Sequence, residues 1–83
     1  MKLHVLKIKD EYFKQVFLRT KTFELRKDDR DYEVGDLIHF VDVNGEDFYY
    51  GLGNLYQITY ILKGVPEYGL QDGYAILSIN QVR

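Results

Sequence analysis

Short segments in which apolar and polar residues alternate, each ended by a turn, dominate this sequence. A period of two is the repeat of a strand with one buried face, and turn residues mark where such strands stop. The pattern predicts about six strands, at residues 3–9, 22–26, 37–42, 48–50, 55–62 and 74–80. Asn44-Gly45 fits the two-residue turn of a hairpin between the third and fourth of them.

A helical period occurs early in the chain, over residues 11–18. Phe13, Val16 and Phe17 follow one another at the spacing of a single helix face. We expect Asp10 to be the N-cap, because its carboxylate can accept the free amide protons of the first turn. The predicted fold class is therefore α+β and mostly β: a small antiparallel β-barrel of about six strands with one short N-terminal helix, in one domain over residues 1–83.

Composition limits the environment of the protein. The 83 residues include no cysteine, which excludes disulfides and cysteine metal sites within this chain. No apolar run approaches the roughly 18 residues of a membrane span, and the N-terminus lacks a signal-peptide core. We therefore expect a cytoplasmic protein without membrane contact, and a monomer by default.

The charges are unevenly distributed along the chain. The net charge is −2, yet residues 1–30 hold nine of the eleven Lys and Arg and five of the thirteen acids, or +4. Residues 31–83 hold two basic and eight acidic residues, or −6. A basic face on an acidic body favours a local anion site over a long nucleic-acid track. The alternative is a solvated surface of uneven charge.

The segment Thr22 to Arg26 gives the basic region its local order. If it is a strand, Thr22, Glu24 and Arg26 share one face. Phe23 and Leu25 are then expected to enter the core. A carboxylate and a guanidinium would lie two residues apart on the same side of the strand.

Lys21, Glu24 and Arg26 are the strongest candidates for chemistry. Ammonium and guanidinium groups can bind a phosphate, a carboxylate or a base edge. Glu24 can accept a hydrogen bond from a nucleobase amino group or act as a general base. The structural alternative is an internal salt bridge from Glu24 to Arg26 or Arg30 that fixes the following loop.

The two histidines give no metal signature. His4 shares its face with Leu6 and Ile8, which is typical of a core or rim residue, and His39 lies in the third predicted strand with the same ambiguity. They are far apart in sequence and lack the spacing of metal ligands. We expect neither a metal nor a cofactor.

The segment Lys21-Thr22-Phe23-Glu24-Leu25-Arg26 matches most of the G-x-K-x-x-E-x-R signature of the ASCH (activating signal cointegrator homology) domain, a branch of the PUA-like fold. Arg19 replaces the signature's glycine. The resemblance continues through further motifs: His4-x-Leu6-Lys7, Lys27-Asp28-Asp29-Arg30-Asp31, Val34-Gly35-Asp36, Thr59-Tyr60-Ile61-Leu62 and Gly73-Tyr74-Ala75-Ile76-Leu77-Ser78. Over nearly its whole length the chain resembles a small single-domain ASCH family of largely unknown function from bacteria and phages.

The resemblance implies an RNA- or nucleotide-binding module with a basic cleft around Lys21, Glu24 and Arg26. RNA or a nucleotide-like small molecule is then the expected partner. The residues expected to bind it are the following: Lys7, Lys21, Glu24, Arg26, Arg30 and Tyr60.

The alternative is a small hydrolase. Some ASCH relatives are described as acetylcytidine amidohydrolases that use a lysine, a threonine and a glutamate, and others as ribonucleases. Lys21 matches the lysine, but Glu24 stands at the threonine position and Leu77 or Ser78 near that of the glutamate. If this chain is an enzyme, Lys21 and Glu24 are the expected catalytic residues. A protein-interaction module with a basic face is a third, non-catalytic option.

Overall fold

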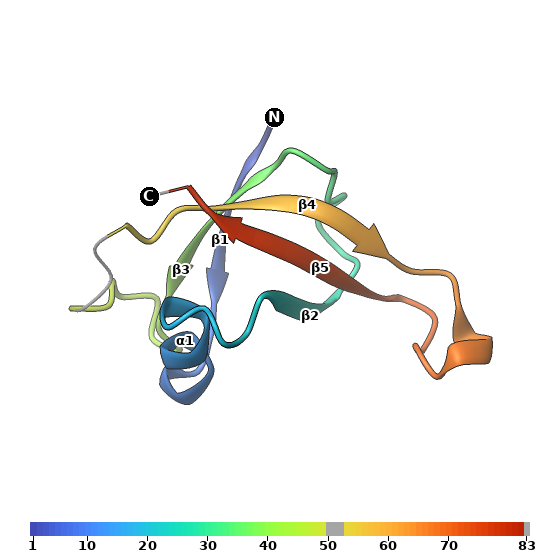
Figure 1. Cartoon of the computed structure of the whole chain (residues 1–83), viewed down its shortest axis with the longest axis horizontal. Coiled ribbons are helices and arrows are strands. Elements are labelled where there is room, and N and C mark those ends of the chain that lie inside the picture. Colours follow the sequence, from blue (N-terminus) through green and yellow to red (C-terminus); the bar gives the residue numbers. More distant parts are fainter. Residues whose placement is uncertain (50–52, 83) are drawn as a thin grey trace.

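The computed structural model describes residues 1–49 and 53–82 of the chain. Within these residues, five strands form one sheet, accompanied by an α-helix and a short 3-10 helix (Figure 1). The elements in chain order are β1 (Leu3–Lys7), α1 (Asp10–Phe17), β2 (Phe23–Lys27), β3 (Leu37–Val41), β4 (Tyr56–Leu62), η1 (Pro66–Tyr68) and β5 (Tyr74–Gln81). Neither described helix has the length and apolar character needed to cross a membrane.

The strands lie in the order β1-β3-β4-β5-β2. β1 runs parallel to β3, and the other neighbours are antiparallel. The sheet curls into a half-barrel with β1 and β2 at its two edges, while the long β4–β5 hairpin projects from the body with η1 at its tip (Figure 1). A mostly-β α+β fold with one early helix is confirmed. The expected six antiparallel strands are wrong, because the described residues form five strands and one pair is parallel.

The segment after β3 accounts for the missing strand. A turn forms here, but it is not the expected two-residue hairpin turn at Asn44-Gly45. The Gly45 amide donates to the Asp42 carbonyl at 2.9 Å, and only Gly45 of the pair has a positive φ, +83°. Phe48 and Tyr49 do not return as a strand, and Tyr50 of the expected strand lies outside the described residues. Phe48 instead stacks on Phe13 of α1, with ring centroids 4.2 Å apart and planes at 12°. Ring packing against the helix takes the place of strand pairing here.

Asn54 completes the hydrogen bonding of β3. Its side-chain oxygen accepts from the Phe40 amide at 3.1 Å, and its side-chain nitrogen donates to the Phe40 carbonyl at 2.7 Å. A buried primary amide has the donor and the acceptor that a neighbouring strand would otherwise supply. One side chain therefore satisfies the backbone of β3 beyond the short stretch that β4 covers.

His39 links β3 to the same segment. Its Nδ1 lies 2.9 Å from the Asn54 carbonyl and its Nε2 lies 2.7 Å from the Asp47 carboxylate. Both partners are acceptors, so this geometry favours the protonated ring, in which both nitrogens donate. The hydrogen bond to Asp47 raises the pKa of His39 above 6.5, against the opposing effect of partial burial. His39 thus fastens the loop that follows β3.

Helix α1 covers one end of the core. Phe13 and Val16 are buried, and the fully buried side chains of the strands pack around them. The apolar members of this core are Leu6, Ile8, Phe13, Val16, Tyr32, Ile38, Phe40, Tyr56, Ile58, Ala75, Leu77 and Ile79. The N-cap residue is Lys9, whose side chain makes no capping bond, so the expectation that Asp10 caps the helix is wrong. Asp10 is the first helical residue and pairs with Lys14 at 3.4 Å.

The helix ends in a left-handed turn. Arg19 has a φ of +64°, its amide donates to the Val16 carbonyl at 3.0 Å, and the Thr20 amide donates to the Gln15 carbonyl at 3.0 Å. These two bonds define the Schellman motif, whose left-handed residue is usually glycine. Arg19 therefore occupies a backbone conformation that most side chains disfavour.

A buried histidine–aspartate pair fixes the parallel strands β1 and β3. His4 Nε2 donates to Asp36 Oδ2 at 2.9 Å, and the backbone amides of Lys2 and Glu33 donate to the same carboxylate at 3.0 Å each. Asp36 precedes β3 and Lys2 precedes β1, so the carboxylate aligns the two strands at their starts. His4 also packs on Tyr32, with ring centroids 4.8 Å apart. The interpretation of His4 as a core residue is confirmed.

This pair makes stability sensitive to acid. Burial alone would raise the pKa of Asp36, but the hydrogen bonds from His4 and from the two amides outweigh it and lower the pKa from 3.8 to about 2. Because the folded pKa is the lower one, the stabilisation is complete above about pH 4 and is lost as the pH falls towards 2. Urea unfolding at a series of pH values should show a weaker loss in this interval for Asp36→Asn than for the wild type.

The matched control is Asp31→Asn, since the Asp31 side chain is 91% exposed. That variant should follow the acid dependence of the wild type. Equal curves for Asp36→Asn and Asp31→Asn would contradict the role assigned to Asp36.

Candidate functional site

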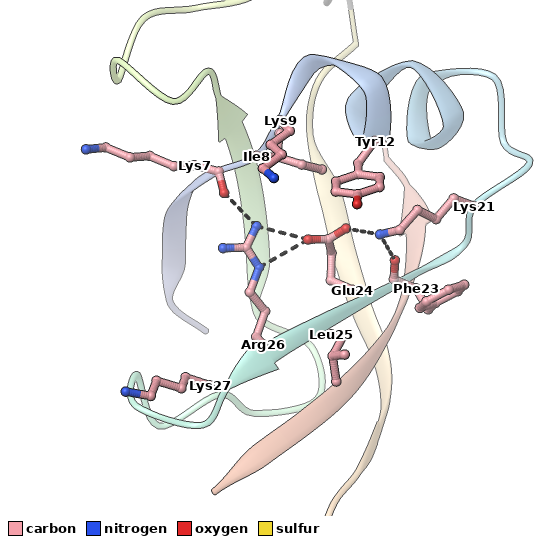
Figure 2. Close-up of a pocket in the computed structure, with 10 residues that line it drawn as sticks. All are labelled: Lys7, Ile8, Lys9, Tyr12, Lys21, Phe23, Glu24, Leu25, Arg26 and Lys27. Atoms are coloured by element: carbon pink, nitrogen blue, oxygen red, sulfur yellow. Dashed lines mark hydrogen bonds and ion pairs between the residues drawn. The ribbon is translucent and has the colours of Figure 1, made fainter. Parts of the chain in front are cut away.

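A pocket of about 490 Å³ opens where the end of β1, the start of α1 and strand β2 meet (Figure 2). Its lining is strongly cationic. Five of the ten lining residues are basic: Lys7, Lys9, Lys21, Arg26 and Lys27. Glu24 is the one acid among the ten, so the lining carries four positive charges in excess. The pocket therefore attracts anions although the whole chain has a net charge of −2.

Glu24 lies at the centre of this lining. Its Oε1 accepts from Arg26 Nε at 3.1 Å and from Arg26 Nη2 at 2.9 Å, and its Oε2 accepts from Lys21 Nζ (Figure 2). Glu24 is only 4% exposed. A buried carboxylate needs such partners, because losing its water would otherwise cost several kcal/mol. The internal salt bridge between Glu24 and Arg26, which was the structural alternative to a binding cleft, is present.

The two arginines of this region reach across to the other edge of the sheet. Arg26 Nη2 donates to the Lys7 carbonyl at 2.8 Å, and Arg30 Nη1 donates to the Val5 carbonyl at 3.1 Å. Strand β1 is an edge strand, so these carbonyls face no neighbouring strand. Guanidinium groups thus join the two edges of the half-barrel in place of backbone pairing.

The inner and outer faces of β2 are the reverse of the expectation. Phe23 and Leu25 are 45% and 56% exposed, whereas Glu24 is buried. Alternation fixes which residues share a face but not which face turns inward. At this edge the concave side meets the polar backbone of β1, so the charged side chains occupy it and the apolar ones face outward.

Aromatic side chains form part of the pocket wall. Tyr12 of α1 lies beside the Glu24–Lys21 pair in Figure 2 and is about half exposed. Lys21 Nζ donates to the Phe23 carbonyl at 2.7 Å and lies 4.8 Å from the centroid of the Phe23 ring. The pocket therefore offers both cations and exposed ring surface to a ligand.

The structure brings together four of the six expected binding residues. Lys7, Lys21, Glu24 and Arg26 all line the pocket. Arg30 is not among the lining residues, because its guanidinium is directed to β1. Tyr60 is 60% exposed on β4 and does not line the pocket either.

Sequence reasoning missed Lys9, Tyr12 and Lys27, which also line the pocket. Lys9 lies between β1 and α1, and Lys27 ends β2, so each carries a charge at the end of a predicted strand. Their closeness follows from the order of strands in the sheet, which the local pattern does not encode.

The arrangement differs from the amidohydrolase set that the resemblance suggested. Leu77, which is fully buried, is the direct strand partner of Glu24, and Ser78 is the partner of Phe23. No carboxylate is therefore found on β5 opposite Glu24. In the described part of the chain, no cluster of three or more His, Asp or Glu is placed to hold a metal ion.

Comparison of the chain with protein-family models gives one match. Residues 3–79 match the family model of a domain of unknown function, DUF3850. The chain belongs to the DUF3850 family. The match includes all the residues that line the pocket. No curated protein matches the chain.

Glu24 should be important for stability. Glu24→Gln keeps the shape of the side chain but leaves Lys21 and Arg26, each 20% exposed, without their counter-charge. We expect a loss of roughly 2 kcal/mol in the free energy of unfolding, measured by urea denaturation.

Glu33→Gln is the matched control. Glu33 pairs with Lys2 at 3.5 Å, but its side chain is 66% exposed. An exposed pair contributes little, so a change below about 0.5 kcal/mol is expected. Similar losses in the two variants would contradict a bracing role for Glu24.

Proposed function

We propose that this protein is an RNA- or nucleotide-binding module of the ASCH type, with a PUA-like fold, and that the pocket around Lys21, Glu24 and Arg26 is its ligand site. The observation that carries the proposal is the lining of five basic residues and one acid in a chain of net negative charge. Phosphate groups are anions that lysine and arginine bind well.

The geometry also favours a ligand that contains a base. Exposed ring surface of Tyr12 lines the same pocket as the cations. Base stacking on aromatic side chains adds about 1–3 kcal/mol per base and tolerates any base. A ligand with a phosphate and a ring system uses both parts of the lining, whereas an inorganic anion uses the cations alone.

Two further observations support the ASCH assignment. The signature glycine corresponds to Arg19, and this position has a left-handed φ of +64°, which glycine adopts most easily. The signature's lysine, glutamate and arginine correspond to Lys21, Glu24 and Arg26, which are joined by hydrogen bonds in the pocket. These three residues of the motif thus form one hydrogen-bonded cluster.

Binding can be measured by fluorescence anisotropy with a labelled single-stranded RNA. With about three phosphate contacts, the logarithm of the affinity should fall with the logarithm of the salt concentration with a slope near −2. Lys27→Ala removes a pocket cation, so it should weaken binding several-fold and reduce the magnitude of the slope by about 0.7.

The matched control is Lys14→Ala. Lys14 is an exposed cation of α1 that pairs with Asp10 and does not line the pocket. Its removal should leave affinity and slope unchanged. A flat salt response, or equal effects of the two variants, would contradict the proposal.

Hydrolysis of a modified nucleoside or of RNA is the second candidate. It is favoured by the direct contact of the Lys21 ammonium with the Glu24 carboxylate inside the pocket, where a base and an electrophile could act on one bond. It ranks second because both Glu24 oxygens already accept hydrogen bonds. A general base would have to exchange one of them for a water molecule.

Proton NMR of an N-acetylated nucleoside incubated with the protein tests this candidate. A catalytic base contributes about 10²- to 10⁴-fold, so turnover should fall by that factor in Glu24→Gln and persist in Glu33→Gln. Both variants should be compared at a temperature at which they are folded. Stable substrate signals with wild-type protein would exclude this substrate.

A further inference from the structure

A second, smaller hollow adjoins the pocket and shares Lys21 with it. Its volume is about 270 Å³, and it lies between the end of α1 and the last residues of β5. Its polar lining consists of Arg19, Lys21, Thr22, Tyr56, Asn80 and Gln81. Two cations and no acid line it, so its electrostatics also favour an anion.

The buried hydroxyl of Tyr56, a residue that lines this hollow, has no hydrogen-bond partner in the described part of the chain. Tyr56 is 2% exposed, and within the described residues its hydroxyl is the one buried side-chain polar atom without a hydrogen-bond partner. Buried hydroxyls are normally paired, and an unpaired one indicates a missing water, ion or ligand. Burial raises the pKa of Tyr56, against the opposing charge of Arg19, so the phenol is a hydrogen-bond donor at neutral pH.

The Arg19 guanidinium is held by hydrogen bonds that an anion can replace. Its Nε and Nη2 donate to the Gln81 side-chain oxygen at 3.0 and 2.8 Å, and Gln81 in turn donates to the Gly53 carbonyl at 3.0 Å. The partner of the guanidinium is thus a neutral amide rather than a carboxylate. An anion is a stronger acceptor for guanidinium than an amide, so it can replace Gln81.

The backbone at Arg19 gives an independent indication. A side chain at a φ of +64° is unfavourable, and glycine would relieve it. Such conformations cluster at functional sites, where the side chain compensates for the strain. The contact between Arg19 and Gln81 is exposed to solvent and stabilises the fold only slightly, so it does not offset this strain.

We propose that this hollow is a second binding site, for a tetrahedral oxyanion such as phosphate, with the Tyr56 hydroxyl donating to the anion and Arg19 supplying the charge. Gln81 releases Arg19 when the anion enters. The site adjoins the proposed RNA or nucleotide pocket, with which it shares Lys21, and it does not require that pocket to be occupied.

The experiment is a titration of isotopically labelled protein with inorganic phosphate, followed by amide NMR, with chloride at equal ionic strength as reference. Saturable shifts are expected at residues 19–22 and 79–81. Tyr56→Phe removes only the hydroxyl, so it should weaken phosphate binding roughly tenfold or more. Because the lost hydroxyl is unpaired, the melting temperature without phosphate should be unchanged or higher.

Two further variants complete the test. Tyr68→Phe makes the same chemical change at a residue that is 82% exposed in η1, and it should bind phosphate like the wild type. Arg19→Gly removes the cation while suiting the left-handed backbone, so it should lose phosphate binding and remain folded.

Three results would overturn the inference. They are equal phosphate affinity in the wild type and Tyr56→Phe, shifts confined to residues 7–9 and 26–27, and no saturable shift at all. The last would mean that water alone serves the Tyr56 hydroxyl. None of the three bears on the salt dependence of RNA binding, so failure of this inference is distinct from failure of the proposed function.

Discussion

The half-barrel depends on the Glu24 carboxylate, which accepts hydrogen bonds from Lys21 and Arg26. A curled sheet that does not close leaves two edge strands with unpaired backbone groups. Arg26 donates to Glu24 and to the Lys7 carbonyl through the same guanidinium, so one side chain connects β2 with β1. Arg30 repeats the connection at Val5. The charged segment that follows α1 therefore acts first as a closure of the fold.

Closure of the fold and the proposed ligand binding use the same residues, and the first supports the second. Glu24 already restricts the rotamers of Arg26 and Lys21. These long side chains would therefore lose less conformational entropy on binding a ligand. The carboxylate neutralises only part of the surrounding charge, since four positive charges remain in excess along the lining. A salt bridge and a binding cleft, which the sequence presents as alternatives, are thus compatible readings of the same three side chains.

The sequence predicts where each strand begins and ends better than it predicts which strands lie side by side in the sheet. The last strand, expected at 74–80, spans Tyr74–Gln81, and the helix expected over 11–18 spans Asp10–Phe17. Local alternation and helical spacing are sufficient for these bounds. The parallel pairing of β1 with β3 depends on contacts more than thirty residues apart, such as His4 with Asp36, which leave no local pattern.

The candidate site shows the same division. Lys21, Glu24 and Arg26 were predictable because one charged motif contains them, and Lys7 because the family resemblance includes it. The burial of Glu24 and the exposure of Phe23 were not, since a period of two defines faces without assigning the inner one. Likewise, strand propensity does not predict that the Asn54 side chain bonds the Phe40 backbone where a neighbouring strand would otherwise do so.

The charge distribution restricts which anions suit the pocket. The chain carries −2 and the pocket lining +4, so the remainder of the molecule carries −6. A duplex lying across the protein would meet this acidic remainder, whereas a small or single-stranded ligand can stay within the basic lining. At physiological ionic strength, charges further away than about 8 Å are largely screened, so the local excess governs a ligand once it is in the pocket. The electrostatics therefore favour a compact phosphate-bearing ligand over an extended duplex.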